Sequence, residues 1–298
     1  MLKANQLKIT TVMDGTVSVI DNMTGGRKLL SQWGFSVLIE AGNKAFLLDV
    51  GTGSEIMNNV QVLGIDLNTI DAIVLSHGHY DHTEGLQAVL AAMHRDSVRI
   101  IAHPEALALK YGKFELKDGS GYEYKYAGIP FRTELLETLG ADFELTTEPT
   151  YLTEDVVVSG EEPMTTSYET VIKEAVTKTT EGFKQDYLPD DQSIYIRTDL
   201  GLVIVMGCAH RGMINIIHHA RELMGEEKVY MVLGGTHLIA ATKEQLDATI
   251  SDLKKINPRW VGVGHCTGQK ASVVLAEEFR HKFFFNNAGT ILHFPYSG

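Results

Sequence analysis

One stretch constrains this chain more than any other: three histidines and an aspartate follow directly on a short apolar run. Residues 72–75 read Ala-Ile-Val-Leu, which predicts a buried strand. Residues 86–93 repeat apolar side chains at helical spacing, which predicts a helix packed on a core. Between them, residues 76–83 read Ser-His-Gly-His-Tyr-Asp-His-Thr. The cluster is therefore expected on a loop at the carboxyl end of a strand, where α/β sheets present their chemistry.

The spacing of this cluster is typical of a metal site. His77 and His79 lie two residues apart, and on an extended or tightly turned backbone their imidazoles can converge on one cation. Asp81 and His82 can then face a second cation close by, and two ions about 3.5–4 Å apart form a known catalytic arrangement. A polar turn whose histidines only cap backbone groups is the structural alternative. We favour the metal site because a dense His/Asp set stands at a strand end.

The order of strand, small residues, histidine and helix recurs in the second half. Three predicted strands between residues 202 and 263 end in Gly-Cys-Ala-His, Gly-Gly-Thr-His and Gly-His-Cys-Thr-Gly. Histidines of a core would fall inside the elements, whereas these fall at strand ends. We therefore expect His210, His237 and His265 to share one site with the first cluster.

The rest of the chain alternates short strands and helices. Leu7 to Met13 predicts a first strand, and residues 35–40 and 44–50 predict a hairpin. Ser54 is a candidate N-cap for the next helix. Residues 170–177 predict a later strand, and Thr242 with Gln245 has the pattern of a capping box.

Residues 111–131 break this rhythm. They hold six of the chain's 24 aromatic residues and several glycines, and they show neither a helical nor a clean strand pattern. This composition predicts a mobile lid whose aromatic rings stack on a flat substrate. Tyr122, Tyr124 and Tyr126 are the candidate substrate contacts. A surface hairpin that covers core, or a subunit contact, is the alternative.

Charge and composition exclude some partners. The net charge of −12 argues against nucleic acid, because phosphate binding needs clustered Lys and Arg. A small anionic substrate stays open, since a local metal site can outweigh the global field. Two cysteines make no disulfide framework, and no run has the length of a signal peptide core or a membrane span. We expect a cytoplasmic protein that binds neither nucleic acid nor membrane; a homo-oligomer remains possible.

The cluster at 76–83, the Asp49-Val-Gly-Thr-Gly turn, the Gly-Cys pair ending at Cys208, and His265 together resemble the signature of the metallo-β-lactamase-fold superfamily. The resemblance implies an α/β fold, a four-layer αββα sandwich of two mixed sheets. It implies one domain over residues 1–298, with a lid insertion at about 111–131. It also implies that Asp49 orients the metal loop rather than binding metal, with a polar residue at a helix start as the alternative.

The same resemblance implies a ligand set. Cys208 takes the position of the bridging residue, and a thiolate is a legitimate zinc ligand; a small buried residue is the alternative. The family's remaining histidine is missing, because the matching region reads Asp-Asp-Gln-Ser at 190–193. Either His210 replaces it, or Asp191 does, or the first metal has fewer ligands; we rank His210 first. His103, at another strand end, is a candidate for contact with the site. The implied metal ligands are His77, His79, Asp81, His82, His210, Cys208 and His265.

The three histidine motifs of the second half, together with the lid, resemble the dihydropteroate-synthase-like branch of the superfamily. That branch is named for an archaeal enzyme that joins a dihydropterin methyl diphosphate to an aminobenzene ribofuranosyl phosphate. The resemblance implies two divalent ions, with zinc favoured and iron or manganese possible. Asp81 would orient a metal-activated water or act as base, and His237 would donate to developing charge.

Three functions follow as alternatives. The first is a binuclear-metal-dependent hydrolase that attacks a phosphorylated or ester-type small molecule. The second is a pterin transferase that forms a C–N bond with loss of diphosphate at the same site. The third is a non-catalytic metal-bound sensor.

Overall fold

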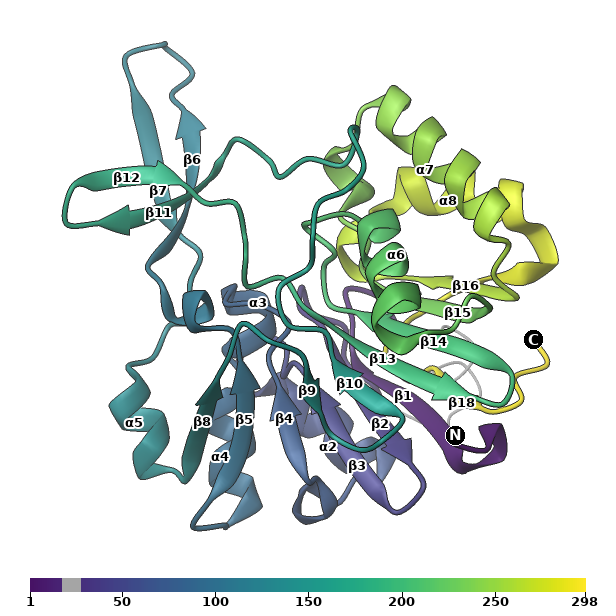
Figure 1. Cartoon of the computed structure of the whole chain (residues 1–298). Coiled ribbons are helices and arrows are strands. Elements are labelled where there is room, and N and C mark those ends of the chain that lie inside the picture. Colours follow the sequence, from purple (N-terminus) through teal and green to yellow (C-terminus); the bar gives the residue numbers. More distant parts are fainter. Residues whose placement is uncertain (18–27) are drawn as a thin grey trace.

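Two large sheets face each other, and helices cover their outer sides, in the computed structural model, which describes residues 1–17 and 28–298 (Figure 1). The first sheet has the strand order β18 (Ile291–His293), β1 (Leu7–Met13), β2 (Ser36–Ala41), β3 (Lys44–Leu48), β4 (Ala72–Val74), β5 (Val98–Ala102) and β8 (Ala141–Leu145). The second has the order β17 (Phe283–Phe285), β16 (Trp260–Val263), β15 (Val229–Gly234), β14 (Gly201–Met206), β13 (Ser193–Thr198), β10 (Val156–Val158) and β9 (Thr150–Tyr151).

Both large sheets are mixed, and this decides where the site can form. In the first sheet β1, β2 and β3 pair antiparallel, whereas β3, β4, β5 and β8 run parallel. In the second sheet β13 and β14 pair antiparallel, whereas β14 to β17 run parallel. Parallel strands of one sheet end at the same edge, so the loops after β14, β15 and β16 can meet there. Contacts such as that between His82 and His265 bring the loop after β4, from the other sheet, to the same place.

Three apolar layers hold the sandwich together. Alternating side chains such as Val37 and Ile39 of β2 pack against Ile194 and Ile196 of β13, between the sheets. The opposite face of the first sheet packs on α2 (Ile56–Leu63), α4 (Leu86–Met93) and α5 (Thr133–Thr138). The opposite face of the second sheet packs on α6 (Met213–Met224), α7 (Lys243–Ile256) and α8 (Gln269–Phe279). The expected four-layer αββα sandwich is confirmed.

Short helices complete the chain at the loops. One turn of helix, α3 (Tyr80–Thr83), follows β4. The 3-10 helices are η1 (Ala4–Gln6), η2 (Gly53–Glu55), η3 (Leu67–Thr69), η4 (Pro104–Leu107), η5 (Leu238–Ala240), η6 (His265–Thr267) and η7 (Arg280–Lys282). None of the helices in the described ranges has both the length and the apolar character that crossing a membrane requires.

The segment at 111–131 is more regular than its sequence suggests. It forms a hairpin of β6 (Lys110–Glu115) and β7 (Tyr122–Tyr126), which joins β11 (Ala175–Thr179) and β12 (Gly182–Gln185) in a small sheet. Figure 1 shows this sheet standing apart from the two large ones. The expectation of an irregular segment is wrong, because cross-strand pairs of aromatic and long side chains stabilise a hairpin that lacks simple alternation.

Two local expectations also need correction, and one holds. Residues 170–174 are not a strand, since pairing with β6 begins only at Ala175. Ser54 lies inside η2, and Glu55 occupies the N-cap of α2 without a side-chain cap bond. Thr242 caps α7 as expected, because its Oγ1 accepts the N–H of Gln245 at 3.2 Å.

Candidate metal centre

The loop after β4 brings two imidazoles together, as its spacing predicts. The Nε2 atom of His77 lies 2.9 Å from Nδ1 of His79. Gly78, between them, is forced by packing: a Cβ there would lie 1.9 Å from the carbonyl oxygen of Ala106. The loop can therefore pass close to Ala106 at Gly78, and the rings on either side of Gly78 lie within contact distance of each other.

His210 joins this pair from the turn after β14. Its Nε2 lies 3.2 Å from Nε2 of His77, and the three histidines form one group that could hold a cation. The ranking of His210 above Asp191 agrees with this placement. Asp191 is buried elsewhere in the loop, where its Oδ2 accepts the backbone N–H of Arg211 at 2.8 Å and so fixes the turn that carries His210.

A second group forms around His82. Its Nε2 lies 3.1 Å from Nε2 of His265, and Oδ2 of Asp81 lies 3.4 Å from the same His265 atom. Asp81, His82 and His265 together could hold another cation. This group comes from the loop after β4 and from the loop after β16, so the two large sheets each contribute to it.

Cys208 lies between the two groups. Its Sγ is 3.1 Å from Nε2 of His82, and it also clusters with His77 on one side and with His265 on the other. Burial raises the pKa of its thiol, so a cation would have to displace a proton to bind it as thiolate. The bridging position that the sequence implies for Cys208 is compatible with this geometry.

The donor atoms fit divalent metal ions. Two ligands bound at 2.0–2.1 Å in tetrahedral geometry lie about 3.4 Å apart, close to the separations of 2.9 to 3.4 Å seen here. Burial lowers the pKa of His77 and His210 well below the usual value, and it lowers the pKa of His79 to about 4. These imidazoles are therefore neutral at pH 7, which is the form that binds a metal.

The second group contains a carboxylate, Asp81, and an imidazole whose pKa is raised, His265. Burial acts to raise the pKa of Asp81, but the neighbouring His82 and His265 outweigh it and hold the pKa below its usual value. Burial likewise acts to lower the pKa of His265, but Cys266 and Asp81 outweigh it and raise that pKa to about 9. Both shifts thus favour the charged forms of this pair, the Asp81 carboxylate and the His265 imidazolium.

Asp49 and Ser76 contact the candidate ligand histidines but belong to neither of the two ligand groups found among the described residues. Oδ2 of Asp49 lies 2.7 Å from Nδ1 of His82, and its Oδ1 accepts the backbone N–H of Ser76 at 2.7 Å. The Ser76 hydroxyl donates to Asp49 and lies 2.9 Å from Nδ1 of His77. Such contacts can fix the tautomer and the direction of a metal-binding imidazole; the orienting role of Asp49 stays a prediction.

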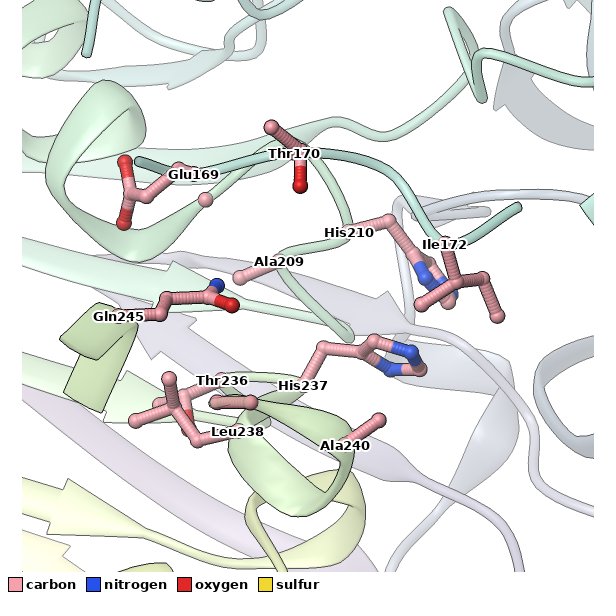
Figure 2. A pocket seen from close by; sticks show the side chains of 12 residues that line it. Glu169, Thr170, Ile172, Ala209, His210, Thr236, His237, Leu238, Ala240 and Gln245 are labelled. Atoms are coloured by element: carbon pink, nitrogen blue, oxygen red, sulfur yellow. The ribbon is translucent and has the colours of Figure 1, made fainter. Parts of the chain in front are cut away.

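His237 and His103 lie beside the centre in different ways. The His237 ring lies 4.2 Å from that of His210, and Figure 2 shows both rings extending in the same direction near Ile172. Nδ1 of His237 is buried and has no hydrogen-bond partner among the described residues. His103 accepts the N–H of Glu105 through Nδ1 at 3.1 Å and belongs to none of the ligand groups found in the described chain.

Several supporting residues were not predicted. Oδ2 of Asp14 accepts the backbone N–H of His265 at 2.7 Å, across 251 positions of sequence. Sγ of Cys266 accepts the N–H of His237 at 3.3 Å and clusters with Cys208 and His265. The adjacency of Cys266 to His265 was the one available sequence signal. Nothing in the local sequence around Asp14 marks it.

A buried lysine ties the hairpin to the metal loop. Nζ of Lys110, at the start of β6, lies 2.9 Å from Asp186 and 2.8 Å from Asp190. The other oxygen of Asp190 accepts the N–H of Gly78 at 2.8 Å. At the end of β7, the carbonyl of Ala127 accepts the N–H of Tyr80 at 2.9 Å. Both strands of the hairpin are thus anchored to the histidine loop.

The hairpin tyrosines lie further out. Tyr122, Tyr124 and Tyr126 are exposed, and Tyr124 stacks on Phe183 of β12 with ring centroids 3.8 Å apart. The Tyr126 hydroxyl donates to the carbonyl of Ile129 at 2.7 Å. Their role as substrate contacts stays a prediction.

Comparison with known proteins gives consistent relatives. Residues 34–166 match the metallo-beta-lactamase superfamily. The chain is 34% identical over 274 residues to the 7,8-dihydropterin-6-methyl-4-(beta-D-ribofuranosyl)-aminobenzene-5'-phosphate synthase of Methanocaldococcus jannaschii, covering 89% of this chain and 90% of the relative.

Two solved structures share the fold. The crystal structure of a metal-dependent hydrolase of the beta-lactamase superfamily has a TM-score of 0.79 at 26% identity and covers 96% of this chain and 98% of its own. A diphosphatase from the PhnP family has a TM-score of 0.54 at 14% identity, covering 97% and 98%, and supports the fold alone. Sequence, fold and full-length relatives agree, and this chain is an enzyme that belongs to the metallo-beta-lactamase superfamily.

Proposed function

We propose that this enzyme is a binuclear-metal-dependent hydrolase that attacks a phosphorylated or ester-type small molecule. The observation that carries the proposal is the pair of ligand groups, His77/His79/His210 and Asp81/His82/His265, with Cys208 beside both. When bound there, two divalent ions would lower the pKa of a shared water and polarise a phosphoryl or carbonyl oxygen.

The chain's own residues supply the remaining chemistry. Asp81 is buried and ionised, so one of its oxygens can accept a hydrogen bond from an attacking water and orient it. His237 has an unpartnered Nδ1 beside His210, and a ring N–H there can donate to charge that develops on the substrate. The αL conformation of His237, with φ of 48°, aims the ring from a turn that η5 and the Cys266 contact hold fixed.

Metal content is the first test. Protein purified without added metal is expected to hold about two equivalents of divalent transition metal, mostly zinc, because imidazole and thiolate ligands suit that ion. Elemental analysis measures this directly. A content below about half an equivalent of every transition metal would contradict a two-ion site of this kind.

A pterin transferase is the second candidate, and the name of the Methanocaldococcus relative, a pterin-related synthase, favours it. In that reaction, metal ions held by the same two ligand groups would bind the diphosphate leaving group while a C–N bond forms. Incubating the enzyme with a dihydropterin methyl diphosphate, with and without an aminobenzene acceptor, separates the two. Release of inorganic phosphate from phosphoesters supports the hydrolase, whereas acceptor-dependent release of diphosphate with a new C–N bond supports the transferase. The three relatives described above are named as enzymes and give no support to a non-catalytic sensor.

We further propose that residues 111–131 act as a lid on a single domain and that Tyr122 contacts the substrate. The anchoring of the hairpin base to the histidine loop supports the lid. Tyr122 is 54% exposed, and the Lys113 ammonium lies 4.0 Å from its ring centroid, so a ligand ring would stack on the side that Lys113 leaves free. Tyr122→Ala is expected to raise KM for a ring-bearing substrate about 2- to 10-fold, since an aromatic pair contributes ~0.5–1.5 kcal/mol beyond burial. Steady-state kinetics should show unchanged turnover of a small activated ester. An unaltered KM for both substrates would exclude the contact.

The setting follows from charge and composition. We propose a cytoplasmic enzyme with a small anionic or pterin-like substrate and without a nucleic-acid or membrane partner. The net charge of −12 supports this, because a polyanion would be repelled outside the metal centre.

A further inference from the structure

A cavity of about 610 Å³ lies against His265, on the side of the metal centre away from the hairpin. We call it the His265 cavity. The loop after β1, the loop after β16 and the start of α8 form its walls, and Phe285 of β17 lines it as well. Figure 1 places α8 and β16 on the other side of α3 from the small sheet. The cavity is therefore distinct from any space under the hairpin.

Apolar side chains are unusually exposed in this cavity. Trp33, Ile239, Val273 and Phe285 all line it, and each is between 46% and 56% exposed. Large apolar side chains left open to water in one concave place mark a binding site more often than chance exposure does. Polar groups, among them the exposed amide of Gln269, lie on the same walls.

The cavity is built onto the metal centre rather than merely near it. The rings of Trp33 and His265 contact each other with centroids 4.9 Å apart. Asp14, on another wall, holds the backbone N–H of His265 at 2.7 Å. A molecule that filled the cavity would thus contact the wall that carries His265, a candidate metal ligand. A reacting group on that side of the molecule would lie beside the metal-binding residues.

We infer that the His265 cavity binds a flat aromatic ring of the substrate whose reacting group lies at the metal centre; this rests on the proposed function. The volume decides the size class: a cavity of about 150 Å³ holds benzene, so about 610 Å³ accommodates a substituted or bicyclic ring. Trp33 favours a flat ring, because its indole lines the cavity, is 46% exposed and gains most from an offset or edge contact with another ring.

This site complements the hairpin. A transferase must hold two ring-bearing molecules at once, and the His265 cavity and the hairpin offer one place on each side of the centre. A hydrolase needs only one of them.

Intrinsic fluorescence can test the inference without turnover. The chain has two tryptophans, and Trp260 is 4% exposed whereas Trp33 is 46% exposed, so Trp33 reports on the cavity. Metal-loaded protein should be titrated with benzoate and with pterin as flat probes, and with cyclohexanecarboxylate as a saturated control that carries the same charge as benzoate. We expect saturable quenching by the flat probes and at least about fivefold weaker binding of the saturated one.

Variants locate the binding. Phe285→Ala keeps Trp33 as the reporter and is expected to raise Kd for the flat probes about 2- to 10-fold. Phe285 is 52% exposed, so its truncation should leave the fold intact. Tyr151→Ala is the matched control, because Tyr151 is a similarly exposed aromatic on β9 that lines none of the cavities found near the centre. It should leave Kd unchanged.

The outcomes separate this inference from the proposed function. Absent quenching, equal affinity for the saturated probe, or an unchanged Kd in Phe285→Ala would overturn the cavity assignment, even in a protein that hydrolyses phosphoesters. Ring binding that depends on Phe285 in a protein without turnover would uphold the cavity and overturn the hydrolase. Repeating the titration on metal-free protein should leave ring binding detectable, since the ring contacts the cavity walls.

Discussion

Turnover is expected to fall at least about 100-fold when His79 is replaced by alanine, because loss of an outer contact to a metal ligand alone costs 10–100-fold and His79 is a candidate ligand itself. Its Nδ1 lies 2.9 Å from Nε2 of His77, and both rings belong with His210 to one candidate ligand group. Bound metal should fall with activity. The ring lies on a half-buried loop outside the apolar core, so its removal opens no core cavity.

The comparison that isolates the metal effect is with metal-free wild type. His79→Ala should unfold at the same temperature as wild type stripped of metal, since both lack the stabilisation that a bound ion gives the native state. His218→Ala is the matched control, because His218 is an exposed histidine on α6 that belongs to no ligand group in the described chain. It should keep metal and activity. Full metal content in His79→Ala would remove the loop from the ligand set.

Replacing Lys110 with methionine is expected to lower the free energy of unfolding by roughly 3–5 kcal/mol, the cost of breaking a buried ion pair from one side. The Lys110 side chain is 1% exposed and lies within 2.9 Å of two carboxylates, those of Asp186 and Asp190. Methionine keeps the length but leaves both carboxylates without a cation. Because Asp190 also holds the N–H of Gly78, weaker metal binding should accompany the loss of stability.

Denaturant unfolding and a metal-competition titration measure the two effects. Lys125→Met is the control on the same hairpin: Lys125 is 63% exposed and pairs with Glu123 at 3.4 Å, and such surface pairs contribute about 0–1 kcal/mol. Adding Asp186→Asn and Asp190→Asn to Lys110→Met should recover part of the stability, since the unpaired charges are then gone. A Lys110→Met variant as stable as Lys125→Met would show that the buried cation is dispensable.

Local sequence was enough for the histidine loop and for an α/β fold, whereas the four-layer arrangement was implied by the resemblance to a known superfamily. His77, His79 and His82 lie within six residues at the end of a three-residue buried strand, so their convergence needs only a turn. The strands and helices around them follow from apolar periodicity, and parallel strands bring the loop ends to one edge. Placing His210 and His265 at strand ends therefore placed them near the same edge.

The sequence did not predict the regular strand pairing of the hairpin, because strand pairing is a contact between segments. β6 pairs with β11, more than sixty positions away, and that partner leaves no mark on the sequence of residues 110–126. The irregular spacing of the tyrosines hid a strand that cross-strand packing stabilises.

Long-range contacts likewise decided which residues support the centre. His210 reaches His77 across 133 positions, Asp14 reaches His265 across 251, and Lys110 reaches Asp190 across 80. A carboxylate or lysine that orients a metal loop looks, in sequence, like any surface charge; only burial and a partner distinguish it. The sequence by itself determined the chemistry available at one sheet edge. The tertiary structure decided which side chains complete it and that an apolar cavity opens beside His265, because each depends on segments that meet only when the two sheets pack.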